Sequence, residues 1–286
     1  MAATFSTNGG VNLKLSPMTN EQFERIRRLS LSLTGIVLAD RHRELLASRC
    51  RRLKIHEGAS LDALLGASET GDPSARQQII GLLTISYTRF FRNAWQFEIA
   101  AEHGSMAIHE RGNARLWSAA AATGEEPYSL SMALIGATGR DDPPVSILAT
   151  DINPEVLEVA RQGEYGEAAI GSLNPELRAR FFSEAAGPAR WRISDAARRL
   201  VKFLQLNLSS GMWPVEGTFD VIFCRNLLMY LEPAHRHRIL KRMASLIAAD
   251  GLLVLDPAEH LGEAQHLFGP GKSGVYTARS ERIGIV

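Results

Sequence analysis

Apolar residues along this 286-residue chain follow two different spacings, and the change between them comes near residue 115. Before that point they recur every three or four positions, as Phe23, Ile26 and Leu29 do, which is the spacing of one helix face. No alternating pattern typical of a strand occurs in this first part of the sequence. The pattern therefore predicts a small all-α N-terminal domain over residues 17–83.

Capping residues mark where the helices of this domain begin. Thr19-Asn-Glu-Gln22 has the form of a capping box, and Asp72-Pro73 places a helix cap before a proline at the first helical position. The expected helices run from about Thr19, from Asp40 to His56, from Ser60 to Gly66 and from Asp72, after a flexible arm over residues 1–16 and before a linker and helix over residues 84–114.

From Arg115 onward, short apolar runs alternate with segments of helical spacing. This alternation predicts an α/β domain over residues 115–286, a doubly wound, mostly parallel sheet with helices on both faces. Ligands of such sheets bind beyond the carboxyl ends of the strands. A last run over residues 274–279 is expected to be an antiparallel edge strand. The predicted parallel strands lie at 115–119, 145–150, 201–206, 219–223 and 251–255.

Composition narrows the class of protein. A hydrophobic content of 45% is typical of a globular domain, and a net charge of +1 gives no general attraction to nucleic acid or membranes. No apolar run is long enough to span a bilayer. The two cysteines, Cys50 and Cys224, cannot build a disulfide framework and lack metal-ligand spacing. We expect a cytoplasmic protein with no metal, no nucleic-acid partner and no membrane insertion.

The turn after the first predicted strand contains small residues, then Gly124, Glu125, Glu126 and Pro127. Phosphate-binding turns carry a Lys or bare amide groups at this point, because their ligand is an anion. Two carboxylates favour a ligand with a positive end, such as the ammonium and sulfonium of S-adenosylmethionine. Alternatively the carboxylates only complement the helix dipole, and an isolated motif favours this second interpretation.

Polar residues also follow the other predicted strands. Asp151 is placed to accept both ribose hydroxyls of an adenosine, or to cap the next helix. Asn207 is either an adenine-edge contact with Leu208 on the ring, or an ordinary loop residue. A nicotinamide site is disfavoured, because position 120 is Ala and no Gly-x-Gly-x-x-Gly follows the first strand.

Four segments occur in an order and at a spacing that characterise one known family. They are Thr88-Arg-Phe-Phe-Arg92, Trp117-Ser-Ala-Ala-Ala-Ala-Thr-Gly-Glu-Glu-Pro-Tyr-Ser129, Ala149-Thr-Asp-Ile-Asn153 and Phe219-Asp-Val-Ile-Phe-Cys-Arg-Asn-Leu-Leu-Met-Tyr230. Together they resemble the signature of the chemotaxis receptor methyltransferases of the CheR type, over about residues 17 to 280. Because the motifs stand in register, we interpret the acidic turn as functional.

The resemblance implies a Rossmann-like class I methyltransferase fold with a small β insert. It implies S-adenosylmethionine as cofactor, S-adenosylhomocysteine as its product, and methyl esterification of chemoreceptor glutamates for chemotactic adaptation. Arg92 and Tyr230 match family positions near the transferred methyl group. The positions that match the family's cofactor pocket are Ser86, Thr88, Arg92, Ala120, Glu126, Asp151, Asn207, Leu208, Cys224, Arg225 and Asn226.

The chain departs from the family pattern at two places. Ser86 stands where the family often has Asn, so its hydrogen-bonding reach is shorter. Asp256-Pro-Ala-Glu259 stands where the family often has Gly-His-Ser-Glu, so any role of that His is absent and Glu259 alone keeps its type.

A glutamate substrate bears directly on the mechanism. Its side chain has a pKa near 4.3, so the nucleophile is ionised at neutral pH and needs no general base. Arg92 is expected to hold the carboxylate through its planar fork, or to form a structural ion pair. Tyr230 is expected to orient a carboxylate oxygen, or to be a half-buried aromatic.

The second predicted helix carries Arg41, Arg49 and Arg52 on one face. This face is either simply solvated or, as the resemblance implies, the docking surface for chemoreceptor helices that bear glutamates. An insert is expected near residues 182–200, where some family members grip a C-terminal receptor pentapeptide. Here the segment is short, with Gly187 as its one glycine, so we expect no such tether.

Two rival functions remain. One is a methyltransferase of the same fold acting on RNA, another protein or a small molecule; interleaved basic and aromatic residues typical of RNA binding are missing. The other is a cofactor-binding scaffold without activity, which the intact Gly124-Glu-Glu-Pro127, Asp151 and Arg92 disfavour. We expect a monomer.

Overall fold

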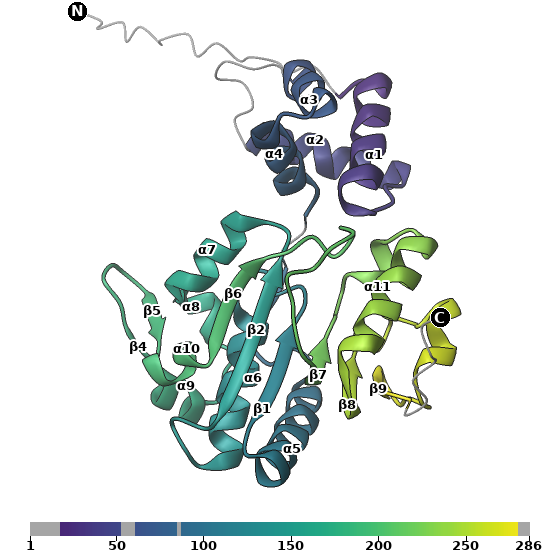
Figure 1. The fold of residues 1–286 in the computed structure, drawn as a ribbon. Helices are drawn as coiled ribbons and strands as arrows, with labels where there is room; N and C mark the ends of the chain where they lie inside the picture. The colour runs from purple at the N-terminus through teal and green to yellow at the C-terminus, as the bar shows by residue number, and fades with distance from the viewer. Residues whose placement is uncertain (1–17, 53–60, 85–86, 280–286) are drawn as a thin grey trace, which may run out of the picture.

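The computed structural model describes residues 18–52, 61–84 and 87–279. The N-terminal helices gather above the edge of the sheet at which the parallel strands end (Figure 1). They bury a cluster of their own that includes Phe23, Ile26, Leu65 and Ile79. Their elements are α1 (Asn20–Thr34), the 3-10 helix η1 (Asp40–His42), α2 (Arg43–Arg52), α3 (Leu61–Thr70) and α4 (Pro73–Leu83).

The two helix starts that were predicted from capping residues, at Thr19 and at Asp72, are confirmed. The Thr19 hydroxyl accepts the Gln22 N–H at 3.1 Å while the Gln22 side chain accepts the Thr19 N–H at 3.0 Å, which completes the capping box. Asp72 accepts the Ala75 N–H at 2.7 Å ahead of Pro73. The expected end of the third helix at Gly66 is wrong, because α3 continues to Thr70 with Leu64, Leu65 and Ser68 buried. The predicted arm over residues 1–16, the start at Ser60 and the end at His56 lie outside the described residues.

The second domain is built on a six-stranded sheet with strand order β6-β2-β1-β7-β8-β9. The first five strands are parallel and β9 is antiparallel, which confirms the doubly wound sheet and its antiparallel edge. β8 begins at Ile247, earlier than the apolar run predicted, and its pairing with β7 shifts register between Phe219 and Val221. The strands are β1 (Ala114–Ser118), β2 (Val145–Asp151), β6 (Val201–Gln205), β7 (Phe219–Phe223), β8 (Ile247–Val254) and β9 (Val275–Thr277).

Alternate residues of the central strands enter two separate hydrophobic clusters. Leu116 and Val221 join one cluster, and Trp117 and Ile222 join the other. Because successive strand residues point to opposite faces, the sheet is buried on both sides. α5 (Ala94–Arg111), α6 (Glu125–Thr138), α7 (Pro154–Gln162) and α10 (Asp195–Arg199) contribute to the first cluster, and α11 (Pro233–Leu246) and the 3-10 helices η2 (Leu228–Tyr230) and η3 (Gly262–Leu267) to the second.

A three-stranded antiparallel sheet of order β3-β5-β4 forms the insert. The expected insert at 182–200 contains only two of these strands, because β3 lies some sixteen residues before β4 in the chain. Three residues are too few to show an alternating pattern, so the sequence gives no sign of β3. Within the described part of the chain, no helix is both long and apolar enough to cross a membrane. The elements are β3 (Glu164–Gly166), α8 (Glu167–Ile170), α9 (Pro175–Phe181), β4 (Phe182–Glu184) and β5 (Arg190–Ile193).

Candidate cofactor pocket and active site

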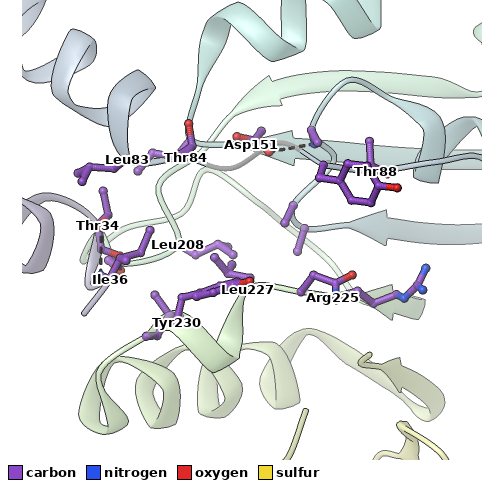
Figure 2. A pocket seen from close by; sticks show the side chains of 18 of the residues that line it. Thr34, Ile36, Leu83, Thr84, Thr88, Asp151, Leu208, Arg225, Leu227 and Tyr230 are labelled. Atoms are coloured by element: carbon purple, nitrogen blue, oxygen red, sulfur yellow. Dashed lines mark hydrogen bonds between the residues drawn. The ribbon is translucent and has the colours of Figure 1, made fainter. Parts of the chain in front are cut away.

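A pocket lies where the parallel strands end, and its walls come from both domains. In Figure 2, Asp151, Thr88 and Arg225 of the sheet domain lie across from Thr34, the last residue of α1, and from Ile36, which follows α1. The small side chains of Ala119, Ala120 and Ala122, which follow β1 in the chain, line the pocket. Other lining residues are Arg49, Arg92, Glu126, Asn207, Leu208, Asn226, Leu227 and Tyr230.

The acidic turn separates its two carboxylates. Gly124 has φ +97°, and a Cβ there would lie 2.8 Å from the Cβ of Ala160, so both conformation and space require glycine. Glu125 turns to the Thr123 hydroxyl at 2.6 Å and does not line the pocket. Glu126 does line it. The arrangement therefore points to Glu126, and not Glu125, as the residue that can contact a ligand.

Glu126 is held on two sides. Its Oε1 accepts the Ser118 hydroxyl at 2.8 Å, and its Oε2 accepts Arg225 Nη1 at 3.2 Å. Burial raises the pKa of Glu126, and the Arg225 guanidinium opposes that rise. A cationic ligand group in the pocket would add to the stabilisation of the ionised carboxylate.

Asp151 ends β2 with its carboxylate in the pocket. Its oxygens accept the backbone N–H groups of Ala122 and Asn153, each at 2.9 Å. The alternative that Asp151 caps the next helix is wrong, because Asn153 caps α7 through the Glu155 N–H. Burial raises the pKa of Asp151, and the backbone donors counteract it. The carboxylate is thus fixed in orientation beside the ligand space.

The loop after β7 is organised by Glu259, which the sequence left without a specific role. Its carboxylate accepts backbone N–H groups of Asn226 at 2.8 Å, Leu227 at 2.9 Å and Met229 at 3.3 Å, and the Asp256 N–H at 3.1 Å. Asn226 is held at φ +57° within this loop. The only signal for this role in the sequence was that Glu259 keeps its type in Asp256-Pro-Ala-Glu259, the segment that otherwise departs from the family pattern.

Arg92 reaches the pocket from the segment before α5. Its Nη2 lies 3.8 Å from Asp256 Oδ2, beyond hydrogen-bond distance, and its side chain is 29% exposed. The Arg92 carbonyl accepts Arg225 Nη2 at 2.7 Å, which fixes the backbone while the guanidinium keeps its donors available. Tyr230 lines the same pocket, and its carbonyl accepts the Val37 N–H at 2.8 Å.

Comparison with known proteins identifies the family. Residues 86–276 match the family described as CheR methyltransferase, SAM binding domain. The chain belongs to the CheR methyltransferase family. It is 36% identical to chemotaxis protein methyltransferase 2 of Pseudomonas aeruginosa over 91% of this chain and 93% of the relative. It is 35% identical to the chemotaxis protein methyltransferase of Salmonella typhimurium, covering 93% of this chain and 92% of the relative.

The residues of this CheR-family pocket fit S-adenosylmethionine, the family's cofactor. Two buried carboxylates, Glu126 and Asp151, suit a ligand that carries positive charge and hydroxyls. The three alanines after β1 leave the backbone open to close approach. Among the described lining residues there is no Lys of the kind that phosphate-binding turns use.

Two predicted pocket positions of this CheR-family chain have other partners. Asn207 Nδ2 donates to the Leu33 carbonyl at 2.7 Å, and its Oδ1 accepts the Ser209 N–H at 2.9 Å. The amide thus joins the sheet domain to the end of α1, while Leu208 beside it lines the pocket. Cys224 is fully buried and does not line the pocket, and its N–H donates to the Val254 carbonyl.

The arginines of η1 and α2, which the sequence placed on one helix face, do not all face the same way. Arg49 Nη1 donates to the carbonyls of Leu82 and Thr84, both at 2.8 Å, and lines the pocket. The free carbonyls at the end of α4 attract a cation, which explains this inward direction. Arg41 is exposed, whereas the side chain of Arg52 and all of Ser86 lie outside the described residues.

Proposed function

We propose that this chain transfers the methyl group of S-adenosylmethionine to glutamate side chains of chemoreceptor cytoplasmic helices. The products are glutamate γ-methyl esters and S-adenosylhomocysteine, and the reaction takes place in the cytoplasm. The observation that carries the proposal is the position of Arg92 and Tyr230, which line the same pocket as Glu126 and Asp151. The relatives named chemotaxis protein methyltransferases support the choice of substrate.

The strand ends would bind and orient the cofactor. Glu126 would bind the ammonium and Asp151 the ribose hydroxyls, and the small alanine side chains after β1 would leave room for the cofactor. When bound, the cofactor would supply an electrophilic methyl carbon, and its sulfur would leave as the thioether of S-adenosylhomocysteine. Thr88, Leu208 and Asn226 complete the wall around it. Alignment is then the main contribution of the protein.

Arg92 and Tyr230 would act on the substrate side. The Arg92 guanidinium can hold one carboxylate oxygen of the glutamate and direct the other oxygen toward the methyl carbon. The Tyr230 hydroxyl can donate to the same carboxylate. An oxygen–carbon bond would form as the carbon–sulfur bond breaks, and no proton would have to leave the ionised glutamate. His42 also lines the pocket, but burial lowers its pKa, so it is not suited to stay protonated at neutral pH.

Receptor helices would dock near α2 as part of the same proposal. Arg41 is exposed in η1, just before α2, and can attract acidic helices, and Arg52 is the last residue of α2. Arg49 donates to two backbone carbonyls and lines the pocket, so it would contribute to substrate binding from the pocket wall. Binding should weaken as salt is added, because exposed charges are screened within about 10 Å at 0.1 M ionic strength. Binding that ignores salt would contradict this docking mode.

We also propose that no receptor pentapeptide tether is needed. The hairpin of β4 and β5 is joined by a five-residue connection, 185–189, with Gly187 as its one glycine. Titration of the protein with such a peptide should give no heat of binding, and a micromolar Kd would overturn the proposal.

The experiment is incubation of the purified chain with methyl-labelled S-adenosylmethionine and a chemoreceptor cytoplasmic fragment. We expect label in the fragment that mild base releases as volatile methanol. Base-stable label would indicate methylation of nitrogen or carbon, and tight cofactor binding without any product would indicate a scaffold. Either result would refute the proposed function.

A further inference from the structure

The residues on either side of Arg92 have an unusual backbone conformation. Phe91 has φ +49° and Asn93 has φ +62°, both in the left-handed region that residues other than glycine seldom adopt. Both lie in the turn over residues 90–93 that precedes α5, which we call the arginine turn. For a bulky residue such as Phe91 this conformation is strained, and strained backbone persists only where the surrounding structure holds it.

Ser129 of α6 holds the arginine turn. The Phe91 N–H donates to the Ser129 hydroxyl oxygen at 2.9 Å, and this hydroxyl donates to the Glu125 carbonyl, one turn earlier in α6, at 2.6 Å. A hydroxyl has one proton to donate, so the bond to Glu125 leaves the lone pairs of the oxygen to accept the Phe91 N–H. Ser129 is fully buried, and an alanine in its place would deprive the Phe91 N–H of this acceptor.

The backbone of Arg92 is fixed more closely than its side chain. Arg225 Nη2 donates to the Arg92 carbonyl at 2.7 Å, and the neighbouring Phe91 ring packs edge-on against the Phe97 ring with centroids 5.4 Å apart. The Arg92 guanidinium approaches Asp256 only to 3.8 Å, beyond hydrogen-bond distance. Its position in the pocket is therefore determined by the backbone that carries it.

We propose that Ser129 is a positioning residue for methyl transfer: it holds Phe91 in the left-handed conformation and thereby places the Arg92 guanidinium against the substrate carboxylate. The proposal rests on the proposed function, since it assumes that Arg92 holds a glutamate. Ser129 itself does not line the pocket and acts only through the arginine turn. Displacing an aligning group by about 1 Å can cost about a hundredfold in rate, so the reaction depends on how this turn is held.

Ser131 provides a matched control for the first test. It lies in the same helix, is also fully buried, and its hydroxyl donates to the carbonyl of Ala197 in α10 at 2.8 Å, and not to the arginine turn. We expect Ser129→Ala to lower kcat for a receptor fragment about tenfold and Ser131→Ala to leave kcat unchanged. Both variants lose a buried hydroxyl, so both should unfold at a lower temperature than the wild type. Affinity for S-adenosylhomocysteine, measured by calorimetry, should stay near that of the wild type in both.

A double variant separates positioning from a general disturbance of the fold. If Ser129 acts through Arg92, then Ser129→Ala should lower kcat no further once Arg92→Ala has removed the guanidinium. A substitution that only loosened the fold would lower kcat by the same factor in both backgrounds. The kcat values of the two single variants and the double variant, measured where all of them are folded, give this comparison.

The backbone conformation can be tested without changing Ser129. Asn93→Gly and Asn93→Val both remove the amide side chain, but glycine adopts a positive φ freely, whereas the β-branched valine resists it. We expect kcat of Asn93→Val to lie about tenfold below that of Asn93→Gly. Equal kcat in these two variants would show that the arginine turn does not need its left-handed conformation, and would contradict the proposal.

The outcomes distinguish this inference from the proposed function. Equal kcat in Ser129→Ala and Ser131→Ala, or an undiminished effect of Ser129→Ala in the Arg92→Ala background, would overturn the positioning role and leave the function intact. A loss of S-adenosylhomocysteine affinity in Ser129→Ala as large as the loss in kcat would also overturn it, because the serine would then act on the cofactor turn. Absence of methylation by the wild type would instead refute the function itself.

Discussion

Arg225 and Glu126 form an ion pair in the wall of the pocket, with Nη1 3.2 Å from Oε2 and side chains only 2% and 11% exposed. The pair joins the end of β7 to the first turn of α6. Through its Nη2, Arg225 also holds the carbonyl of Arg92 at 2.7 Å. One guanidinium thus links the carboxylate proposed to bind the cofactor to the backbone of the residue proposed to hold the substrate.

Removing the charge of Glu126 should destabilise the protein strongly. In Glu126→Gln the guanidinium of Arg225 stays buried without its counter-charge, which typically costs about 3–5 kcal/mol of the free energy of unfolding. Urea denaturation measures this loss. The double variant Glu126→Gln, Arg225→Met should recover part of it. A coupling energy near zero between Glu126 and Arg225 in the free energy of unfolding would contradict the pairing. Glu125→Gln is the neighbouring control, and we expect this variant to keep its affinity for the cofactor.

Glu259 should control both stability and turnover. The amide of Glu259→Gln offers one acceptor oxygen where the carboxylate serves four N–H groups, so the loop over residues 226–229 loses bonds to a charged acceptor. We expect a loss of about 3 kcal/mol in the free energy of unfolding and slower methyl transfer. Glu263→Gln lies nearby in η3, is exposed, and should change neither quantity. Equal behaviour of the two variants would argue against this role of Glu259.

Arg92→Ala should separate catalysis from folding. The Arg92 side chain makes no close ion pair, and the bond to Arg225 uses its backbone carbonyl, which the substitution leaves in place. We expect kcat to fall at least about tenfold while the thermal midpoint of unfolding stays close to that of the wild type. Methyl transfer at near wild-type rates by this variant would remove Arg92 from the proposed mechanism.

Turnover should be insensitive to pH near neutrality. A glutamate nucleophile is already ionised, and burial lowers the pKa of His42 below its ordinary value, so this ring changes charge only at more acidic pH. We expect kcat at saturating cofactor and substrate to be flat between about pH 6.5 and pH 8. A steep rise across that interval would require a general base that this mechanism does not contain.

The strand-end residues could be predicted because parallel strands bring their carboxyl ends to one edge of the sheet. That rule alone places Asp151, Leu208 and Arg225 near one another, and the structure has all three on the pocket. The family resemblance assigned Glu126, and not Glu125, to the cofactor pocket, and of the two only Glu126 lines it.

Other features depended on contacts between distant parts of the chain. The bond from Asn207 to Leu33 joins residues 174 positions apart, and no local pattern announces it. The inward direction of Arg49 follows from where α4 ends, which the spacing of residues on α2 does not show. β3 is too short for any periodicity to reveal it. Long-range partners of polar side chains are thus what the sequence left undetermined.

The central claim is that the transferred methyl group ends on a glutamate oxygen. Tandem mass spectrometry of a receptor fragment, after incubation with the wild-type enzyme and unlabelled S-adenosylmethionine, localises the added group directly. The account predicts methylation confined to glutamate side chains and lost on treatment with base, with far less product from Arg92→Ala. A methyl group on a lysine or arginine nitrogen, or one that survives base, would contradict it.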